Sequence, residues 1–532
     1  MQFKPSKEQE DIFNSVKYGI GNIVINAKAG SGKSTTIIKA LEQISEDKKV
    51  ILIAHNKDIV NHLKSKIKRD KKNTIITTYH SLGYKILHEN IKSGLTFNEY
   101  KYVSYIHKNL SVLSGGETLS MTNNKVKKYR KNVLLLADYA RFNLCQREKE
   151  IAKIAEKYKV PIFSNEISAT KMVLDWGKNN LNEFDFTDMI WLPFELQLNT
   201  FFNKCDWVIV DEAQDTSPAQ QELFKKCFKR NGRFIIVGDD RQCINVWCGS
   251  DEDAFKKFSK MDNTKQLPLN TSYRCPKSII EKAQTIVSDI VCKDDAEDGE
   301  INYETNIMEA NDGDMVLCRN TAPLARLYAE YLKKEKNAYI RGKDIGKNLI
   351  DLINDTESDE ISLTLEKDGI IPRLYMDLFS VWYETCERYG VDKEGGLNTH
   401  EVMDIYDSIK AIESLSYNLA TRQELVDRIE KVFNDENKDG VCLSTVHKAK
   451  GLEADNVYLL CPSLIPSKLC KKDWERKSEQ NLLYVAITRA KKTLNYVSEK
   501  LFPPGNGFFG TSLLLVELNN VLEKIEKCTI QK

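Results

Sequence analysis

The sequence predicts an α/β protein with two parallel-sheet cores, each interrupted by an inserted, mainly helical subdomain. Three observations lead to this prediction. The chain has 532 residues, which is too long for one hydrophobic core. Short β-rich apolar runs alternate with longer helical patterns, as they do in parallel sheets with crossover helices. Finally, the segments 89–184 and 346–439 lack strand signals and are too long for ordinary loops.

The expected strands fall into two groups, one before about residue 245 and one after about 314. These strands are 22–26, 50–54, 207–210, 233–237, 315–318, 440–444 and 456–460. The grouping places the first core at 1–88 and 185–268, with a helical insertion at 89–184 that contains a basic run. It places the second core at 269–345 and 440–532, with its insertion at 346–439. An amphipathic pattern at 512–527 predicts a closing helix.

Composition excludes several classes of protein. With 41% hydrophobic and 29% charged residues, the chain has the composition of a soluble globular protein. We expect no membrane partner, because no apolar run could cross a bilayer and no signal peptide is present. The net charge of +1 means that nucleic-acid binding would depend on local patches such as 125–131, although such a run is more often a solvated face. The 13 cysteines lack zinc-site spacing, which favours a reducing compartment such as the cytoplasm, nucleoid or a viral replication site.

A glycine-rich turn follows the first expected strand. The turn, AKAGSGKS, fits the pattern G-x-x-x-x-G-K-[ST] except that alanine replaces the first glycine, and a helical pattern follows it. Gly30 and Gly32 let backbone N–H groups close around phosphates at the helix N-terminus. Lys33 should reach the β- and γ-phosphates of ATP, and Ser34 should ligate Mg²⁺. The residues expected to hold the nucleotide here are Ala29, Gly30, Ser31, Gly32, Lys33, Ser34 and Thr35.

Two adjacent carboxylates follow the buried strand at 207–210. We expect Asp211 to hold Mg²⁺, directly or through water, and Glu212 to orient the water that attacks ATP. An apolar run that ends in Asp-Glu is a weak signal alone, but it becomes strong in a chain that also has the glycine-rich turn. The next strand leads into Gln242, which is suited to sensing the γ-phosphate.

At this point the order of motifs resembles that of the UvrD/Rep-type superfamily 1 DNA helicases. The resemblance extends from about residue 4 to about residue 497. It implies two RecA-like motor cores with ATP between them, and 3′→5′ movement along single-stranded DNA, although the residues themselves do not show polarity. The segments that carry it are PSKEQ at 5–9, DEAQD at 211–215, GDDRQCI at 238–244, LNTSYR at 269–274, VLCRN at 316–320, TVHKAKGLE at 445–453 and YVAITRA at 484–490.

The resemblance also implies further contacts to the nucleotide. Gln9 would read the adenine edge, Tyr273 would stack on adenine, and Glu453 would bind the ribose. Arg274 would contact the γ-phosphate, and Arg489 would be an arginine finger, a group worth roughly 10³–10⁵ in rate in related phosphoryl transfers. The residues expected to carry the chemistry are Lys33, Ser34, Asp211, Glu212, Gln242, Arg274 and Arg489.

Contacts to the nucleic-acid strand are also implied by the resemblance. Trp247 matches a family residue that stacks on a base, and such stacking is worth about 1–3 kcal/mol per base. The segment 186–190 resembles a further family segment just before the two carboxylates. The residues expected at the strand are Asn56, Lys57, Thr78, His80, Trp247 and His447.

These features predict an ATP-dependent DNA helicase that uses Mg²⁺ and is stimulated by single-stranded DNA. We expect it to act on single strands and DNA junctions in replication, repair or recombination, as a monomer or weak oligomer. One alternative is a translocase that displaces proteins, or acts on RNA, without duplex unwinding. The other is a nucleic-acid-binding scaffold with a degenerate motor, against which the intact Lys33, Asp211, Glu212 and Arg489 argue.

Overall fold

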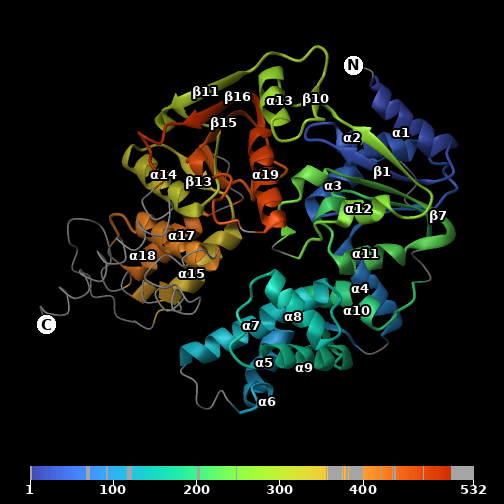
Figure 1. The fold of residues 1–532 in the computed structure, drawn as a ribbon, viewed down its shortest axis with the longest axis horizontal. Helices are drawn as coiled ribbons and strands as arrows, with labels where there is room; N and C mark the ends of the chain where they lie inside the picture. The colour runs from blue at the N-terminus through green and yellow to red at the C-terminus, as the bar shows by residue number, and fades with distance from the viewer. Residues whose placement is uncertain are drawn as a thin grey trace, which may run out of the picture. The chain divides into compact units, whose positions relative to one another are not determined.

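The computed structural model divides the chain into two compact units, Met1–Thr271 and Ser272–Lys532 (Figure 1). The expected strand contact Trp247, the closing helix expected at 512–527 and much of the segment 346–439 lie outside the described residues. The structure describes residues 3–67, 72–91, 94–116, 123–200, 204–246, 249–354, 356, 374, 377–378, 381–382, 400–419, 421–433, 435, 439–470 and 472–504.

The first unit is built on a six-stranded parallel sheet with the strand order β3-β2-β6-β7-β1-β8. Its central strands contain apolar runs, such as 207–210 and 234–237, because helices cover both faces of the sheet. The order places β7 between β1 and β6, so the turns that follow these three strands lie at the same edge of the sheet. The strands are β1 (Asn22–Ala27), β2 (Val50–Ala54), β3 (Thr74–Thr78), β6 (Cys205–Val210), β7 (Phe228–Gly238) and β8 (Thr264–Leu269).

Helices cover the two faces of this sheet in two separate hydrophobic clusters. One cluster packs α1 (Lys7–Tyr18), α2 (Lys33–Glu42) and α3 (Lys57–Lys66) against the strands. The other contains side chains from helices on the opposite face, because neighbouring residues of a strand point to opposite sides. The helices of this second face are α4 (Tyr79–Asn90), α11 (Pro218–Lys225) and α12 (Ala254–Ser259).

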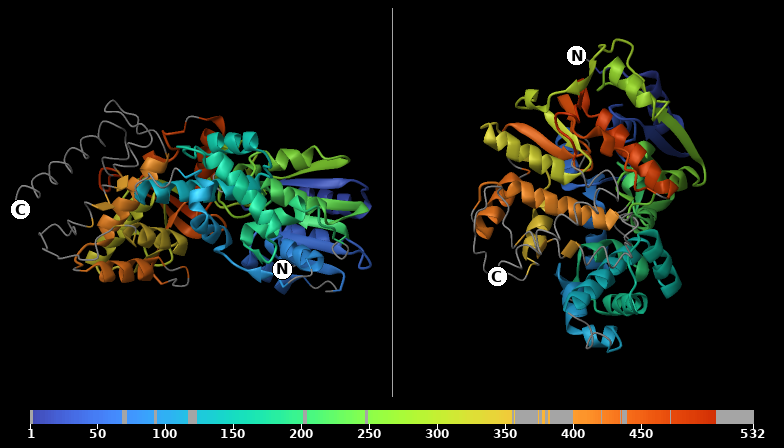
Figure 2. Two further views of the ribbon diagram at one scale, coloured as in Figure 1. Left: turned by 90° about the horizontal axis from the view of Figure 1, so that it is seen from below. Right: turned by 60° about the vertical axis from the view of Figure 1, so that its left-hand side comes forward.

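A helical insertion separates α4 from β6. It has a hydrophobic core of its own, to which Trp191 and Leu192 of α10 (Phe186–Glu195) also belong. At its base, the short strands β4 (Thr96–Phe97) and β5 (Glu183–Phe184) pair in parallel. The helices gather in one bundle (Figure 2): α5 (Lys101–Lys108), α6 (Leu110–Leu113), α7 (Asn123–Phe142), α8 (Glu148–Lys157) and α9 (Glu166–Asn179).

The second unit contains another six-stranded parallel sheet, ordered β11-β16-β15-β12-β14-β13. Its strands are β11 (Glu300–Thr305), β12 (Met315–Cys318), β13 (Ala338–Ile340), β14 (Val441–Thr445), β15 (Ala454–Leu459) and β16 (Ala490–Val497). Its principal helices are α13 (Lys277–Gln284), α14 (Thr321–Lys333), α15 (Lys343–Asn354), α17 (His400–Leu415), α18 (Arg422–Val432) and α19 (Asp473–Ile487).

Two parallel-sheet α/β units confirm the predicted fold class, and each strand expected from the sequence is present. The described helices include none whose length and apolar character would let it span a bilayer.

Candidate functional site

The glycine-rich turn after β1 forms a cradle for phosphate. Gly30 and Gly32 have φ angles of 74° and 77°, in the left-handed region that glycine adopts without steric cost. Gly32 is the N-cap of α2, and no side chain caps this helix end. The first turn of α2 therefore presents backbone N–H groups and the positive end of the helix dipole toward an anion.

A chain of four hydrogen bonds connects the turns after β1, β6 and β7. The Lys33 ammonium donates to Oε1 of Glu212 at 2.7 Å, and Nε2 of Gln214 donates to the other Glu212 oxygen at 2.6 Å. The Gln214 carbonyl oxygen accepts from the backbone N–H of Asp239 at 3.1 Å. The Asp239 carboxylate in turn accepts from Nε2 of Gln242 at 2.7 Å. Lys33, Glu212 and Gln242 are thus brought together as expected, through two residues that sequence reasoning missed.

The missed residues, Gln214 and Asp239, occupy the short 3₁₀ segment after β6 and the end of β7. Asp239 is fully buried and Gln214 is 1% exposed, so each needs a partner for its polar groups. The signal that could have found them is the run DEAQD read together with GDD, provided that β6 and β7 are known to be neighbours.

Glu212 sits in a strained backbone conformation. Its φ of 51° lies in the left-handed region, which is rare for a residue with a side chain. Such strain persists only where surrounding contacts impose it, and it clusters at functional sites. Here the bonds from Lys33 and Gln214 fix the carboxylate, so the local conformation is maintained by the same groups that form the site.

The charges around Lys33 are strongly coupled. Burial, followed by the neighbouring Glu212 carboxylate, raises the pKa of Asp211 to about 7. Burial alone would lower the pKa of Lys33, but Glu212, Asp211 and Asp239 outweigh it and raise that pKa. The site therefore keeps a cation beside a cluster of acids. A buried carboxylate at Asp211 and a hydroxyl at Ser34 are hard oxygen donors of the kind that Mg²⁺ prefers, so these residues fit that ion.

Gln9 lies directly against this site. Its Nε2 donates to Oγ1 of Thr36 in α2 at 3.0 Å, and its Oε1 accepts from the backbone N–H of Ser6 at 3.1 Å. A primary amide has a second N–H and a second lone pair. Gln9 therefore keeps one donor and one acceptor for a base edge, which is the pair that adenine matches through N7 and N6.

Lys28 is a further cation in the turn that sequence reasoning missed. It is 2% exposed, and its ammonium lies 3.2 Å from Oδ1 of Asp240. Asp240 begins the 3₁₀ segment that contains Gln242. This ion pair therefore connects the glycine-rich turn after β1 to the turn after β7.

In the second unit, the expected nucleotide residues gather around the end of α19. The Arg274 guanidinium forms an ion pair with Glu453, with Nε 2.6 Å from Oε2. It also donates from Nη1 to the backbone carbonyl of Thr488 at 3.3 Å. Tyr273 is 47% exposed, so its ring is accessible for stacking.

Arg489, also at the end of α19, is almost fully buried. Its Nε donates to the Val485 carbonyl at 2.9 Å, and its Nη1 donates to the Leu452 carbonyl at 3.1 Å. Arg489 and Arg274 are thus both fixed close to Thr488, and the three expected groups Arg274, Glu453 and Arg489 belong to one local cluster.

The expected strand residues of the first unit lie where helices begin after β2 and β3. Asn56 caps α3 by accepting from the Ile59 N–H at 2.9 Å, and Thr78 caps α4 by accepting from the Ser81 N–H at 3.2 Å. These two side chains are thus engaged in helix caps, while Lys57 is exposed. The N-termini that they define are favourable places for backbone phosphates.

Two histidines expected at the strand have lowered pKa values. Burial, reinforced by the nearby His55, lowers the pKa of His80. Burial, followed by the Arg319 guanidinium, lowers the pKa of His447 to about 4. Near neutral pH both rings are therefore neutral, and they can contribute hydrogen bonds or stacking but no positive charge.

Phe186, the first residue of α10, is an exposed aromatic that was not named as a strand contact. Its ring is 52% exposed and lies 6.0 Å from the His80 ring in an edge-to-face arrangement. The sequence signal was present in the family-like segment 186–190, but a single phenylalanine beside a buried helix reads equally well as core.

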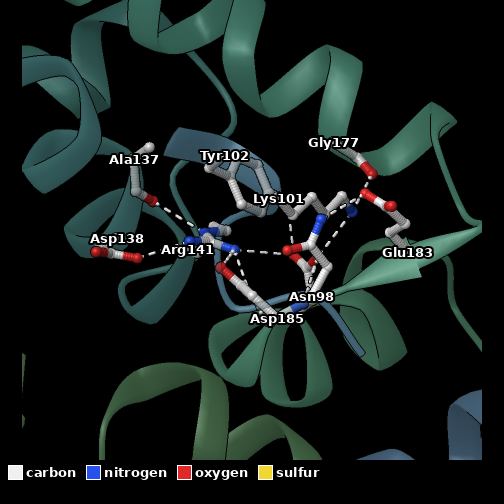
Figure 3. A network of polar contacts seen from close by, with 10 residues as sticks. Asn98, Lys101, Tyr102, Ala137, Asp138, Arg141, Gly177, Glu183 and Asp185 are labelled. Carbon is white, nitrogen blue, oxygen red and sulfur yellow. Dashed lines mark hydrogen bonds and ion pairs between the residues drawn. The ribbon is translucent and has the colours of Figure 1, made fainter. Parts of the chain in front are cut away.

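Buried charges anchor the start of α10 to the insertion (Figure 3). Asp188 accepts from the Lys101 ammonium at 2.7 Å, from the Tyr102 hydroxyl at 2.6 Å and from Nη1 of Arg141 at 2.9 Å. Nη1 of Arg141 also donates to both carboxylate oxygens of Asp185, at 2.8 and 2.9 Å. We refer to these five residues, Lys101, Tyr102, Arg141, Asp185 and Asp188, as the insertion network.

Comparison with known proteins gives matches to two family models. Residues 6–263 match the UvrD/REP helicase N-terminal domain, and residues 384–500 match the UvrD-like helicase C-terminal domain.

Individual relatives are distant in sequence. The ATP-dependent DNA helicase Rep of Buchnera aphidicola subsp. Acyrthosiphon pisum is 20% identical over 90% of this chain and 93% of its own length. A probable DNA helicase II homolog of Mycoplasma pneumoniae is 22% identical over 80% of this chain and 63% of its own length. The ATP-dependent DNA helicase PcrA of Bacillus subtilis is 25% identical over 51% of this chain and 38% of its own length.

Proposed function

The chain belongs to the UvrD/Rep-type superfamily 1 DNA helicases, and we propose that it couples Mg²⁺-dependent ATP hydrolysis to 3′→5′ movement along single-stranded DNA and to duplex unwinding. The observation that carries the proposal is the hydrogen-bonded chain from Lys33 through Glu212, Gln214 and Asp239 to Gln242. It joins a phosphate cradle, a carboxylate and a glutamine, the parts that an ATP hydrolase of this kind needs.

Nucleotide binding would change the partners within this chain. The γ-phosphate of ATP competes with Glu212 for the Lys33 ammonium, because both are anions within reach of the same donor. Once Lys33 turns to the phosphate, Glu212 keeps its bond from Gln214, while its Oε1 is released from Lys33. That oxygen can orient the attacking water and accept its proton.

Other residues would place and stabilise the nucleotide. Asp211 and Ser34 would hold Mg²⁺, which supplies charge neutralisation at the phosphates when bound. Gln9, Tyr273 and Glu453 would fix the adenosine, while Arg274 and Arg489 would act on the γ-phosphate. The roles of Asp211 and Ser34 follow from the residue pattern itself, and the roles of the other residues follow from the family motif at each position.

The strand would be held by contacts that tolerate any sequence. The helix N-termini at Asn56 and Thr78 suit phosphates, whereas His80 and Phe186 suit base or sugar contacts. Because no contact in this set reads a base edge, we propose a general role at single strands and junctions in replication, repair or recombination.

A strand-displacement assay tests the proposal. Duplexes of DNA and of RNA, with 3′ or 5′ single-stranded tails, would be incubated with the full chain with and without ATP. We expect ATP-dependent separation of the 3′-tailed DNA duplex and little separation of the 5′-tailed one. Strand-stimulated ATP hydrolysis without separation would favour a translocase, preferential separation of the RNA duplexes would show an RNA helicase, and failure of any strand to stimulate hydrolysis would contradict the proposal.

A further inference from the structure

Aromatic rings form a continuous strip where the insertion joins the first core. The strip runs between two histidines on α4, with neighbouring ring centroids 4.7–6.0 Å apart. Its members come from four elements, α4, β4, β5 and α10. In order, the rings of this aromatic strip are His80, Phe186, Phe97, Phe184, Tyr84 and His88.

The strip has one buried member and three strongly exposed ones. Phe184 is 2% exposed, while Phe97 is 44%, Tyr84 is 40% and Phe186 is 52% exposed. A soluble protein rarely leaves several neighbouring aromatic rings open to water unless something binds them. The buried ring of Phe184 therefore supports the exposed rings of Tyr84 and Phe97, which pack against it.

The rings of the strip are tilted against each other rather than stacked. Phe97 meets Phe186 at an interplanar angle of 65°, and Tyr84 meets Phe184 at 35°. Elsewhere in the insertion, Tyr105 stacks on Trp176 at 3.9 Å and 10°, so these two rings already cover each other's faces. The tilted, exposed rings of the strip instead leave aromatic faces for another planar group.

The structure beneath the strip fixes the positions of its rings. The register of β4 and β5 sets Phe97 beside Phe184. The insertion network (Figure 3) holds the N-terminus of α10, the helix that begins at Phe186. Gly83 of α4 packs so tightly on α10 that a Cβ there would lie 1.7 Å from the Met189 carbonyl oxygen. The aromatic surface is therefore preformed, which lowers the entropy lost on binding.

We propose that Phe97 and Tyr84 extend the strand-binding surface from His80 and Phe186 onto the insertion by stacking on bases of single-stranded nucleic acid. This inference rests on the proposed function. The strip is continuous with His80, which follows the α4 N-terminus assigned to phosphate. Lys85 is exposed on the same helix, and its ammonium suits a polyanion better than an apolar partner. Every base has a π-face, so the added contacts remain independent of sequence.

Binding to two oligonucleotides of equal length tests this proposal, one of oligo-dT and one with abasic sites in place of the thymidines. Fluorescence anisotropy would give the affinity of the full-length wild type, Phe97→Ala, Phe97→Leu and Tyr84→Ala. Phe97→Leu keeps apolar volume but lacks an aromatic face. The matched control is Phe163→Ala, since Phe163 is 51% exposed in the same insertion and is not a member of the strip. Thermal unfolding of each variant checks that it is folded.

We expect both Phe97 variants, and Tyr84→Ala, to bind oligo-dT at least about fivefold more weakly than the wild type. Their affinity for the abasic strand should stay within about twofold of the wild type, and Phe163→Ala should match the wild type on both strands. Equal losses on both strands would overturn the proposal by showing a structural role for the rings. Unchanged oligo-dT binding would overturn it in favour of a protein-docking surface. A wild type that binds neither strand would overturn the proposed function, and this inference with it.

Discussion

The first unit contains two clusters of paired charged side chains that differ in how fully those side chains are buried. At the nucleotide site, the side chains of Lys33 and Glu212 form an ion pair while remaining 15% and 21% exposed. In the insertion network, Lys101 and Asp188 form an equally short ion pair with both side chains fully buried. The same chemical groups, at the same distance, occur in two very different settings.

The two clusters also differ in the state of their acceptors. Asp188 already accepts from three side-chain donors and from the backbone N–H of Asp185, so the insertion network has little capacity to take up a ligand. At the nucleotide site, Glu212 has a strained backbone, and its side chain remains 21% exposed. A short buried ion pair therefore does not by itself indicate a binding site. Backbone strain and partial exposure together distinguish the functional cluster from the structural one.

Lys33→Ala should have the largest effect on activity. Removal of the ammonium deprives the γ-phosphate of its main side-chain donor, and we expect strand-stimulated ATP hydrolysis to fall by about 10³-fold or more. Steady-state hydrolysis with saturating single-stranded DNA measures this. Lys39→Ala, on the same helix and paired with exposed Glu42, is the matched control and should retain wild-type turnover. Near-wild-type hydrolysis by Lys33→Ala would show that the cluster of Lys33 and Glu212 is not the catalytic site.

Lys101→Met should instead affect stability. It leaves Asp188 with two of its three side-chain donors in a fully buried position, so the free energy of unfolding should fall by about 3 kcal/mol. Chemical denaturation followed by circular dichroism provides the measurement. Lys171→Met, which breaks an exposed pair with Asp175 on α9, should change stability by no more than about 0.5 kcal/mol. If the two variants were equally stable, the insertion network would not be the anchor described above.

Asp185→Asn should remove a modest pH dependence of stability. Burial raises the pKa of Asp185 to about 6, although the Arg141 guanidinium acts in the opposite direction. Between about pH 4 and 6, the folded protein then holds a proton that the unfolded chain has released. The contribution of Asp185 to the free energy of unfolding is therefore present at low pH and is lost as the pH rises through about 6.

Thermal unfolding of the wild type and Asp185→Asn at several pH values between 4 and 7 checks this prediction. As the pH rises, the free energy of unfolding of the wild type should fall by about 1 kcal/mol relative to that of Asp185→Asn. If the difference in free energy of unfolding did not vary with pH, Asp185 would be ionised throughout this range. Its hydrogen bonds from Arg141 favour that ionised state.

The sequence predicted those parts of the molecule that depend on local patterns. Strand β2 and residues 207–210 of β6 are uninterrupted apolar runs, and the turn at Lys33 has a fixed spacing of glycines and lysine. Several other strands of the two sheets, β3, β8, β11, β13 and β16, were not among those expected. Two of them show why: β11 is largely exposed, and β13 is only three residues long. Neither provides the continuous apolar run that identifies a central strand.

The missed parts of the site depend on which segments become neighbours. Gln214 and Asp239 meet only because β7 lies between β6 and β1, an order that no local pattern encodes. Lys101 and Arg141 look like surface charges in a charged helical segment, yet both are buried because Asp188 lies between them. Phe97 is a similar case, since its significance arises from its pairing register with Phe184.

Glu212→Gln tests whether Glu212 exchanges Lys33 for the attacking water when ATP binds. Glutamine preserves the shape of the side chain but cannot accept the proton, so single-turnover hydrolysis on single-stranded DNA should slow by about 10²–10⁴-fold. Because Lys33 remains available to the phosphates, ATP binding should be as tight as in the wild type or tighter. A variant that binds ATP normally and hydrolyses it at the wild-type rate would contradict the account.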